Sequence, residues 1–163
     1  MTKNLLNSTT IIAGLMILNN GCALYLPCEK IPIAKYVDDQ IAKKFDPTKD
    51  KAVIYFYREL LPASEHKISE IKINNSETHN LMCESFIRIE LKPGFHKFSS
   101  SYNHISSELD IITEANKLYY FKMGRSRDYS NKSILFGYSI KFQLQQIPEL
   151  DAQFEIKKCR LVQ

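Results

Sequence analysis

The residues of this chain best suited to metal binding or nucleophilic chemistry are four cysteines and four histidines: Cys22, Cys28, Cys83, Cys159, His66, His79, His96 and His104. Zinc sites usually take such ligands in closely spaced pairs, and His79 with Cys83 is the one pair with suitable spacing. No second pair accompanies it, so the sequence predicts neither a bound metal nor a cofactor. For His96, which follows Gly94, a hydrogen-bonding structural role is the favoured interpretation.

Motifs for covalent catalysis or nucleotide binding are absent from the sequence. There is no G-x-S-x-G elbow, P-loop, dinucleotide fingerprint or C-x-x-C pair. Carboxylates such as Glu59 and Glu65 could form an acid/base pair, but nothing distinguishes them from other acids. The sequence therefore predicts no catalytic residues and a protein that is not an enzyme.

Residues 1–21 have the features of an export signal. Lys3 supplies a positive start, and residues 11–18 form an apolar run too short to span a bilayer. The run is followed closely by Gly21-Cys22, which resembles the lipobox of bacterial lipoproteins. The match departs from that family's pattern at two positions, Asn19 and Asn20, where the family prefers Leu and a small residue.

The lipobox resemblance implies cleavage before Cys22 and acylation of its thiol and its new amine. Several acyl chains, at about 0.8 kcal/mol per buried CH₂, would hold the chain on a membrane. The residue after Cys22 is Ala23 and not Asp, which resembles lipoproteins of the outer membrane that face the periplasm. An ordinary secretory signal cut elsewhere, or a short anchor left in place, are the alternatives.

Three further cysteines follow Cys22: Cys28, Cys83 and Cys159. Export to an oxidising compartment permits one disulfide with one thiol left over. Buried, unpaired thiols are the alternative, and the sequence does not choose between the two.

Composition and charge favour one folded domain and exclude one class of partner. The chain has 163 residues, 44% of them hydrophobic, with 9 Tyr and 9 Phe, which fit pleated surfaces. The formal charge is +4, and removing residues 1–21 takes away only Lys3. This excess is too small for a typical nucleic-acid-binding protein, so none is predicted as a partner.

Basic residues at two places are candidate partner-binding positions. Arg58 ends a strongly apolar run, where it either pairs with a carboxylate at the sheet edge or anchors an acidic partner. Lys122, Arg125 and Arg127 belong to a basic segment that includes a predicted loop at 124–132. That loop is either simply solvated or a contact for phosphate-rich lipid headgroups or an acidic protein.

The elements expected around these residues are mostly strands. Residues 22–49 form a tether punctuated by prolines, with a short amphipathic helix over about 36–45, and residues 50–160 form the domain. Strands are predicted at 51–58, 68–73, 108–113, 117–123, 138–144 and 152–156, and residues 147–151 are a loop or one helical turn. Residues 86–101 read as a hairpin around Pro93-Gly94, with a type II turn.

Together these elements predict an all-β domain, an antiparallel β-sandwich of about seven to eight short strands. Its general type is immunoglobulin-like or transthyretin-like, with little helix.

Three motifs occur in an order that resembles a known family. They are residues 50–58, Lys92-Pro93-Gly94-Phe95-His96, and Ala115-Asn116-Lys117-Leu118-Tyr119-Tyr120. The chain resembles, over residues 48–157, short bacterial lipoproteins that share domain of unknown function 2846. It departs from them at Asn116 and at Asn74-Asn75, where those proteins have Gly, and Asn tolerates the same left-handed conformation. The resemblance implies a signal peptide, a tether and one β domain, and it implies no activity.

Two functions remain open at this stage. The first is a periplasmic, membrane-anchored interaction or structural module that recruits an envelope protein. The second is a sandwich that holds a small apolar or lipid ligand between its sheets. A pocket lined by Phe56, Phe98, Tyr120 or Phe142 would favour the second function, and a filled core would favour the first.

Overall fold

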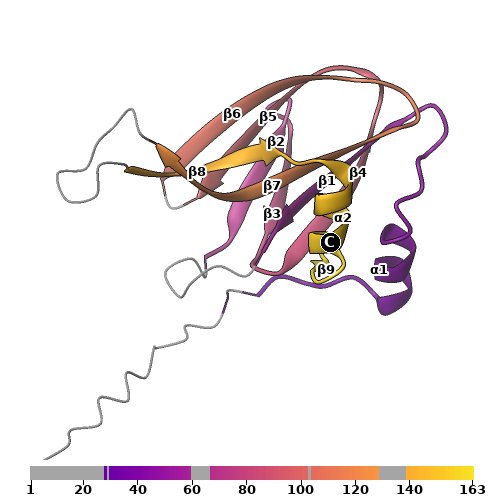
Figure 1. Ribbon diagram of the computed structural model, residues 1–163, viewed down its shortest axis with the longest axis horizontal. Helices are drawn as coiled ribbons and strands as arrows, with labels where there is room; N and C mark the ends of the chain where they lie inside the picture. Colours follow the sequence, from indigo (N-terminus) through magenta and orange to yellow (C-terminus); the bar gives the residue numbers. More distant parts are fainter. Residues whose placement is uncertain (1–27, 29, 60–66, 103, 129–138) are drawn as a thin grey trace, which may run out of the picture.

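The computed structural model describes residues 28, 30–59, 67–102, 104–128 and 139–163 (Figure 1). Cys22 and the predicted signal segment lie outside the described residues. In chain order the elements are α1 (Tyr36–Ala42), β1 (Ala52–Arg58), β2 (Ser69–Ile73), β3 (Glu77–Leu81), β4 (Ser85–Leu91), β5 (Gly94–Tyr102), β6 (Ile105–Thr113), β7 (Lys117–Asp128), β8 (Ser139–Gln146), α2 (Glu149–Ile156) and β9 (Arg160–Leu161). No helix among these residues is long and apolar enough to cross a bilayer.

The strands form two sheets, in the orders β8-β7-β1-β4-β9 and β3-β2-β5-β6. One core cluster lies between the sheets, and a second covers the other face of the five-stranded sheet under both helices. The prediction of a β-sandwich is confirmed. The five-stranded sheet is mixed, because β1 pairs with β7 and β4 with β9 in parallel.

Strand β1 lies at the centre of the five-stranded sheet and is buried along its whole length, as its unbroken apolar run predicts. Ile54 and Phe56 face the other sheet, whereas Tyr55 and Tyr57 face the helices. This alternation follows from the two-residue period of a strand, and it places one set of aromatic rings in each core.

The predicted helix near residues 36–45 is confirmed as α1, but the predicted strand at 152–156 is wrong. Residues 149–156 form α2, and Ala152 and Ile156 point into the core beneath it while Phe154 is exposed. An apolar set at alternate positions fitted a strand, yet Ala152 and Ile156 are four residues apart and share one helix face. Acidic Glu149 and Asp151 in the first turn suit the helix N-terminus.

The predicted hairpin at 86–101 is also wrong. Strand β4 pairs with β1 and β9, whereas β5 pairs with β2 and β6 in the opposite sheet. The link at 92–93 therefore crosses between the sheets, and Gly94 allows this with a φ of +140°, which side-chain-bearing residues rarely adopt. The predicted face of β4 holds, since Ile87, Ile89 and Leu91 all contact the core between the sheets.

Strand β7 is longer than predicted. The segment 124–128, read as the start of a basic loop, continues the strand because it pairs with β8 as far as Asp128 and Ser139. Pairing with β8 keeps these polar residues in a strand, although their composition alone is typical of a loop. The turns at Asn74-Asn75 and at Asn116 are confirmed, and all three residues have positive φ.

The register defines two ends of the sandwich. At one end Arg58 of β1 pairs with Ser85 of β4, beside Cys83; we call this the Cys83 end. At the other, Ala52 pairs with Leu91 next to Gly94; we call this the Gly94 end.

Candidate functional site

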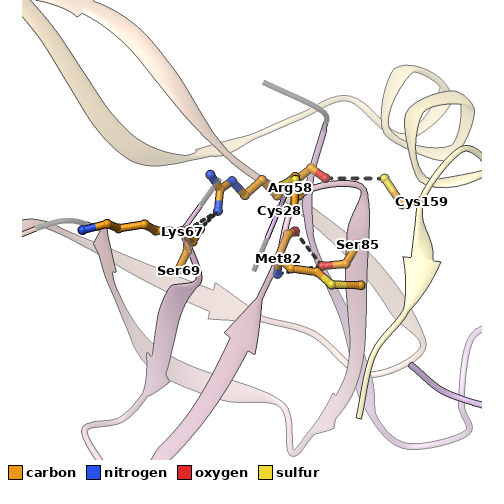
Figure 2. The surroundings of a disulfide bond; sticks show 8 residues. Cys28, Arg58, Lys67, Ser69, Met82, Ser85 and Cys159 are labelled. Atoms are coloured by element: carbon orange, nitrogen blue, oxygen red, sulfur yellow. Dashed lines mark hydrogen bonds between the residues drawn. A yellow bond between two sulfur atoms is a disulfide. The ribbon is translucent and has the colours of Figure 1, made fainter. Parts of the chain in front are cut away.

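Arg58 lies inside the Cys83 end of the sandwich and is fully buried (Figure 2). Its Nη1 donates hydrogen bonds to the Lys67 carbonyl at 2.5 Å and to Ser69 Oγ at 3.0 Å. The guanidinium also lies over the ring of Tyr102, 4.8 Å from its centroid. Burial lowers the pKa of Arg58, and Tyr102 partly offsets that effect. Arg58 therefore ties the two sheets together and offers no surface contact to a partner.

Lys122 lies in a cluster of charged groups where β7 meets α2. Its Nζ is 2.5 Å from Glu59 Oε2 and 3.1 Å from both Glu155 carboxylate oxygens. Tyr57 donates a hydrogen bond of 2.5 Å to Glu155 Oε2 from the other side. Lys122 is thus held by two carboxylates and connects the sheet to α2.

The pKa values in this cluster reflect burial and pairing together. Burial alone would lower the pKa of Lys122, but Glu59 and Glu155 outweigh it and the pKa is raised. Burial would likewise raise the pKa of Glu155, yet Tyr57 and Lys122 bring it below its usual value. Burial, then Glu155, raises the pKa of Tyr57. At neutral pH the cluster is therefore an ion pair with a neutral phenol, an arrangement that fastens α2 to the sheet.

Cys159 is a free, buried cysteine beside this cluster. Its Sγ lies 3.6 Å from the Arg58 carbonyl (Figure 2). The Glu155 carbonyl is also 3.6 Å from this Sγ, so the single S–H has two possible acceptors. Burial, then Glu59 and Glu84, raises the thiol pKa to about 12. The thiol is therefore protonated and unsuited to act as a nucleophile at neutral pH.

Cys28 and Cys83 form a disulfide, with their Cα atoms 6.1 Å apart. Of the two alternatives left open by the sequence, the structure has one disulfide and one free thiol. The disulfide joins the tether to the turn between β3 and β4, where Ser85 Oγ both accepts from the Met82 N–H and donates to the Met82 carbonyl. Because Cys83 is oxidised, it is no partner for His79, and the described residues contain no group of three or more potential metal ligands.

The structure does not gather the other predicted basic residues into one site. Lys122 faces α2, whereas Arg125, three positions along β7, lies toward the opposite face of the sheet. The side chain of Arg127 and the rest of the predicted loop, residues 129–132, lie outside what the structure describes. His96, in contrast, has its predicted structural role: its Nε2 bonds the Lys92 carbonyl at 2.8 Å and its Nδ1 lies 3.1 Å from Asn74 Nδ2.

A hollowed, basic surface at the Cys83 end was missed by the sequence reasoning. Lys158 lines three adjacent hollows of about 390, 410 and 200 Å³. Cys28 lines the first of these together with Lys30 and Arg160, and Lys157 lines the second. We call Lys30, Lys157, Lys158 and Arg160 the basic face. The run Lys157-Lys158-Cys159-Arg160 was the available signal, but Lys30 joins it only through the disulfide.

The four residues of the basic face are exposed, and the described part of the chain gives them no ion pair. The neighbouring Lys43 differs, because its Nζ is 2.8 Å from Asp39 Oδ2 and donates to the Cys159 carbonyl at 2.6 Å. Four acids also line the three hollows: Asp39, Glu59, Glu84 and Glu155. Asp39 pairs with Lys43, and Glu59 and Glu155 pair with Lys122, so Glu84 is the exposed acid that remains beside the four cations. The basic face therefore carries an excess of solvated positive charge.

An exposed apolar pair lies at the Gly94 end. Phe95 and Ile112 are direct cross-strand partners on β5 and β6 and are 64% and 74% exposed. Both side chains stand on the outer surface of the four-stranded sheet, away from the core. We call them the distal pair, since the disulfide lies at the other end of the sandwich.

Aromatic rings fill the space between the sheets. Phe56 lies 5.0 Å from Phe98 and 5.4 Å from Phe121, and Tyr102 stacks on Phe142 at 4.2 Å. Tyr120 lies in the other cluster, under the helices, so the four rings expected to line one pocket do not surround a common space. The larger hollows lie at the surface instead.

Comparison with known proteins identifies related chains without an assigned activity. A family model described as protein of unknown function (DUF2846) matches residues 48–136. An uncharacterized protein of Haemophilus influenzae is 27% identical over 143 residues, which cover 86% of this chain and 80% of the relative.

Proposed function

The chain belongs to the DUF2846 family, and on that premise we propose that the mature protein is a lipid-anchored module of the bacterial envelope that recruits a protein partner. The proposed anchor is a set of acyl chains on Cys22, and the proposed location is the periplasmic side of the outer membrane. The proposed role is an interaction or structural one, without catalysis.

Support for export comes from the Cys28–Cys83 disulfide. Disulfides persist in oxidising compartments such as the periplasm and are rare in the cytosol. The apolar run before Cys22 and the Gly21-Cys22 pair agree with that compartment.

The observation that carries the choice of an interaction module is the filled space between the sheets. Phe56, Phe98 and Phe121 contact one another there, so no volume for a small apolar ligand separates them. The distal pair instead leaves apolar area in water, which favours contact with another protein. Cys159, protonated and turned toward backbone carbonyls, supports a role without catalysis.

The anchor is tested by intact mass and fractionation of the protein expressed in a Gram-negative host, with Cys22→Ser as the matched variant. We expect wild type to gain the mass of a diacylglycerol and a fatty acyl chain and to sediment with outer membranes. The variant should lack that mass. An unmodified wild-type chain in the soluble periplasm would refute the anchor.

The recruitment role is tested by site-specific photocrosslinking in the same host. A crosslinker at Phe95 or Ile112 should give a discrete adduct with an envelope protein, and one at Lys72, exposed on the same sheet, should not. An adduct should also weaken when Ile112→Asp is combined with the crosslinker at Phe95. Equal crosslinking from all three positions would argue against a partner site at the distal pair.

A further inference from the structure

We propose that the basic face lies against the surface of an anionic phospholipid bilayer, so that the Cys83 end of the domain rests on lipid headgroups. This inference rests on the proposed acylation of Cys22. It adds an orientation, a second membrane contact and a lipid class to that anchor.

The chain between the proposed anchor and the disulfide is short. Five residues, 23–27, separate Cys22 from Cys28. Six steps from Cys22 to Cys28, at no more than about 3.6 Å each, limit the distance between the two Cα atoms to roughly 22 Å. Because Cys28 is bonded to Cys83, that limit applies to the folded domain and not only to the tether. The Cys83 end therefore stays within this distance of the acylated residue.

The surface that this tether keeps near the membrane is positively charged. Lys30, Lys158 and Arg160 line the same hollow as Cys28. Attraction to anionic headgroups falls off within about 8 Å at physiological ionic strength, so it acts only on cations held close to the bilayer. A tether of this length lets the exposed cations approach within that range, and their attraction to the headgroups would then keep them there.

A purely structural role would explain only some of these residues. Lys157 and Lys158 follow the C-terminal end of α2, where the helix dipole stabilises positive charge. Lys158 Nζ also lies 4.1 Å from the centroid of the Phe154 ring. Lys30 and Arg160 belong to the tether and to β9, and neither is at a helix end. The disulfide unites all four on one surface, which a helix-capping role does not require.

The orientation has a consequence for the other end of the domain. With the Cys83 end on the bilayer, the Gly94 end points away from it, because β1 and β4 run from one end to the other. The distal pair then faces the periplasm, where a partner protein can reach Phe95 and Ile112.

The test is vesicle co-sedimentation of the mature chain, residues 22–163, carrying Cys22→Ser so that no acyl chain contributes. Vesicles are pure phosphatidylcholine, or phosphatidylcholine with about 30% phosphatidylglycerol, at about 0.1 M salt. The test variant replaces Lys30, Lys157, Lys158 and Arg160 with Gln. The control variant makes the same charge change elsewhere, by replacing with Gln the exposed Lys49, Lys72, Lys92 and Lys117.

We expect the unsubstituted chain to bind the anionic vesicles in preference to the neutral ones. Its partition coefficient should fall roughly tenfold in the basic-face variant and less than twofold in the control. If the basic-face variant melts early, Lys30→Glu with Arg160→Glu, which leaves α2 intact, serves instead. Equal binding to both vesicle types, or equal losses in the two variants, would overturn the inference.

Failure of the anchor and failure of this inference are separable. The intact mass of the wild-type protein reports acylation alone, and the vesicle assay uses a chain that cannot be acylated. If the wild-type protein is not acylated but the basic-face variant binds anionic vesicles more weakly, the proposed anchor is refuted and the lipid-binding surface is supported. If the wild-type protein is acylated but the basic-face variant binds anionic vesicles as well as the unsubstituted chain, the anchor is supported and the lipid-binding surface is refuted.

Discussion

The phenolic oxygen of Tyr57 on β1 donates a hydrogen bond of 2.5 Å to Glu155 Oε2 on α2. The same carboxylate accepts from Lys122 on β7, so one acidic side chain joins the helix to two neighbouring strands. Glu155 is 22% exposed, which limits the screening of these bonds by water. The attachment of α2 to the sheet therefore depends on the charge state of Glu155.

Glu155→Gln should reduce the free energy of unfolding at pH 7 by about 1–3 kcal/mol, because a charged acceptor is lost. The folded-state pKa of Glu155 is lowered, so its contribution is present above the unfolded pKa of about 4.3 and is lost as pH falls through the folded value. Urea denaturation of wild type at pH 7 and at about pH 3 should show that loss, and the variant should show less of it. Glu108→Gln, which breaks the exposed pair with Lys97, is the control and should change stability little.

Cys159 should resist alkylation in the folded protein. In the mature chain carrying Cys22→Ser, with Cys28 and Cys83 bonded, iodoacetamide at pH 8 should label no thiol, since burial raises the Cys159 pKa to about 12. In denaturant without reductant, mass spectrometry should find one label, on Cys159. Rapid labelling of the native protein would contradict the buried, hydrogen-bonded thiol.

Loss of the disulfide should destabilise the domain. Cys28 and Cys83 are 55 residues apart, and closing such a loop stabilises the folded state by about 4 kcal/mol in the chain-entropy account. Cys28→Ala should therefore lower the Tm, as measured by circular dichroism. Dithiothreitol should lower the wild-type Tm and leave that of the variant unchanged. If reductant affected neither protein, the bond would contribute nothing to stability.

Gly94→Ala should cost about 1–3 kcal/mol, and Gly94→Val at least as much, because the φ of +140° strains any residue with a Cβ. Space is not the cause, since nothing lies within 4 Å of a Cβ built there. Gly124→Ala is the matched control. The φ of Gly124 is not positive, and a Cβ added there would meet only the Lys122 side chain, at 3.9 Å. The Tm of Gly124→Ala should therefore stay close to that of wild type. Equal Tm values for the two alanine variants would refute backbone strain at Gly94.

Local features of the fold were predictable, and the choice of sheet for each strand was not. The unbroken apolar run of β1 and the positive φ of Asn116 follow from properties of a few adjacent residues. The separation of β4 from β5 depends on which distant strands compete for each edge, and a short link with Pro93-Gly94 suits either a hairpin or a crossing. The strand predicted at 152–156 was wrong for a similar reason, because the spacing of its apolar residues fits both a strand and one face of a helix.

The candidate surfaces were predictable to different degrees. Arg58 was singled out as a costly charge in an apolar strand, but the predicted positions, at a sheet edge or on a partner-binding rim, are wrong, because the residue is buried in the central strand β1. Its contacts with Ser69 and Tyr102 come from elements that sequence cannot place beside it. The cations around Lys158 form a run that sequence displays, and only the Cys28–Cys83 pairing adds Lys30 to them.

The two sides of the five-stranded sheet are assembled from segments made at very different times. Strand β1 needs β7 as its parallel neighbour, and a bridge from Ile33 to Val162 joins the tether to the segment after β9 (Figure 1). Parallel pairs and such distant contacts form slowly, since a long loop must close first. During synthesis, residues 30–59 therefore become available long before β7 and β9, and the sheet can be completed only once residue 162 has been made. Strand β1 can pair with β4 as soon as residues 85–91 are available, but its other edge stays open, and prone to wrong pairing, until residues 117–122 of β7 have been made.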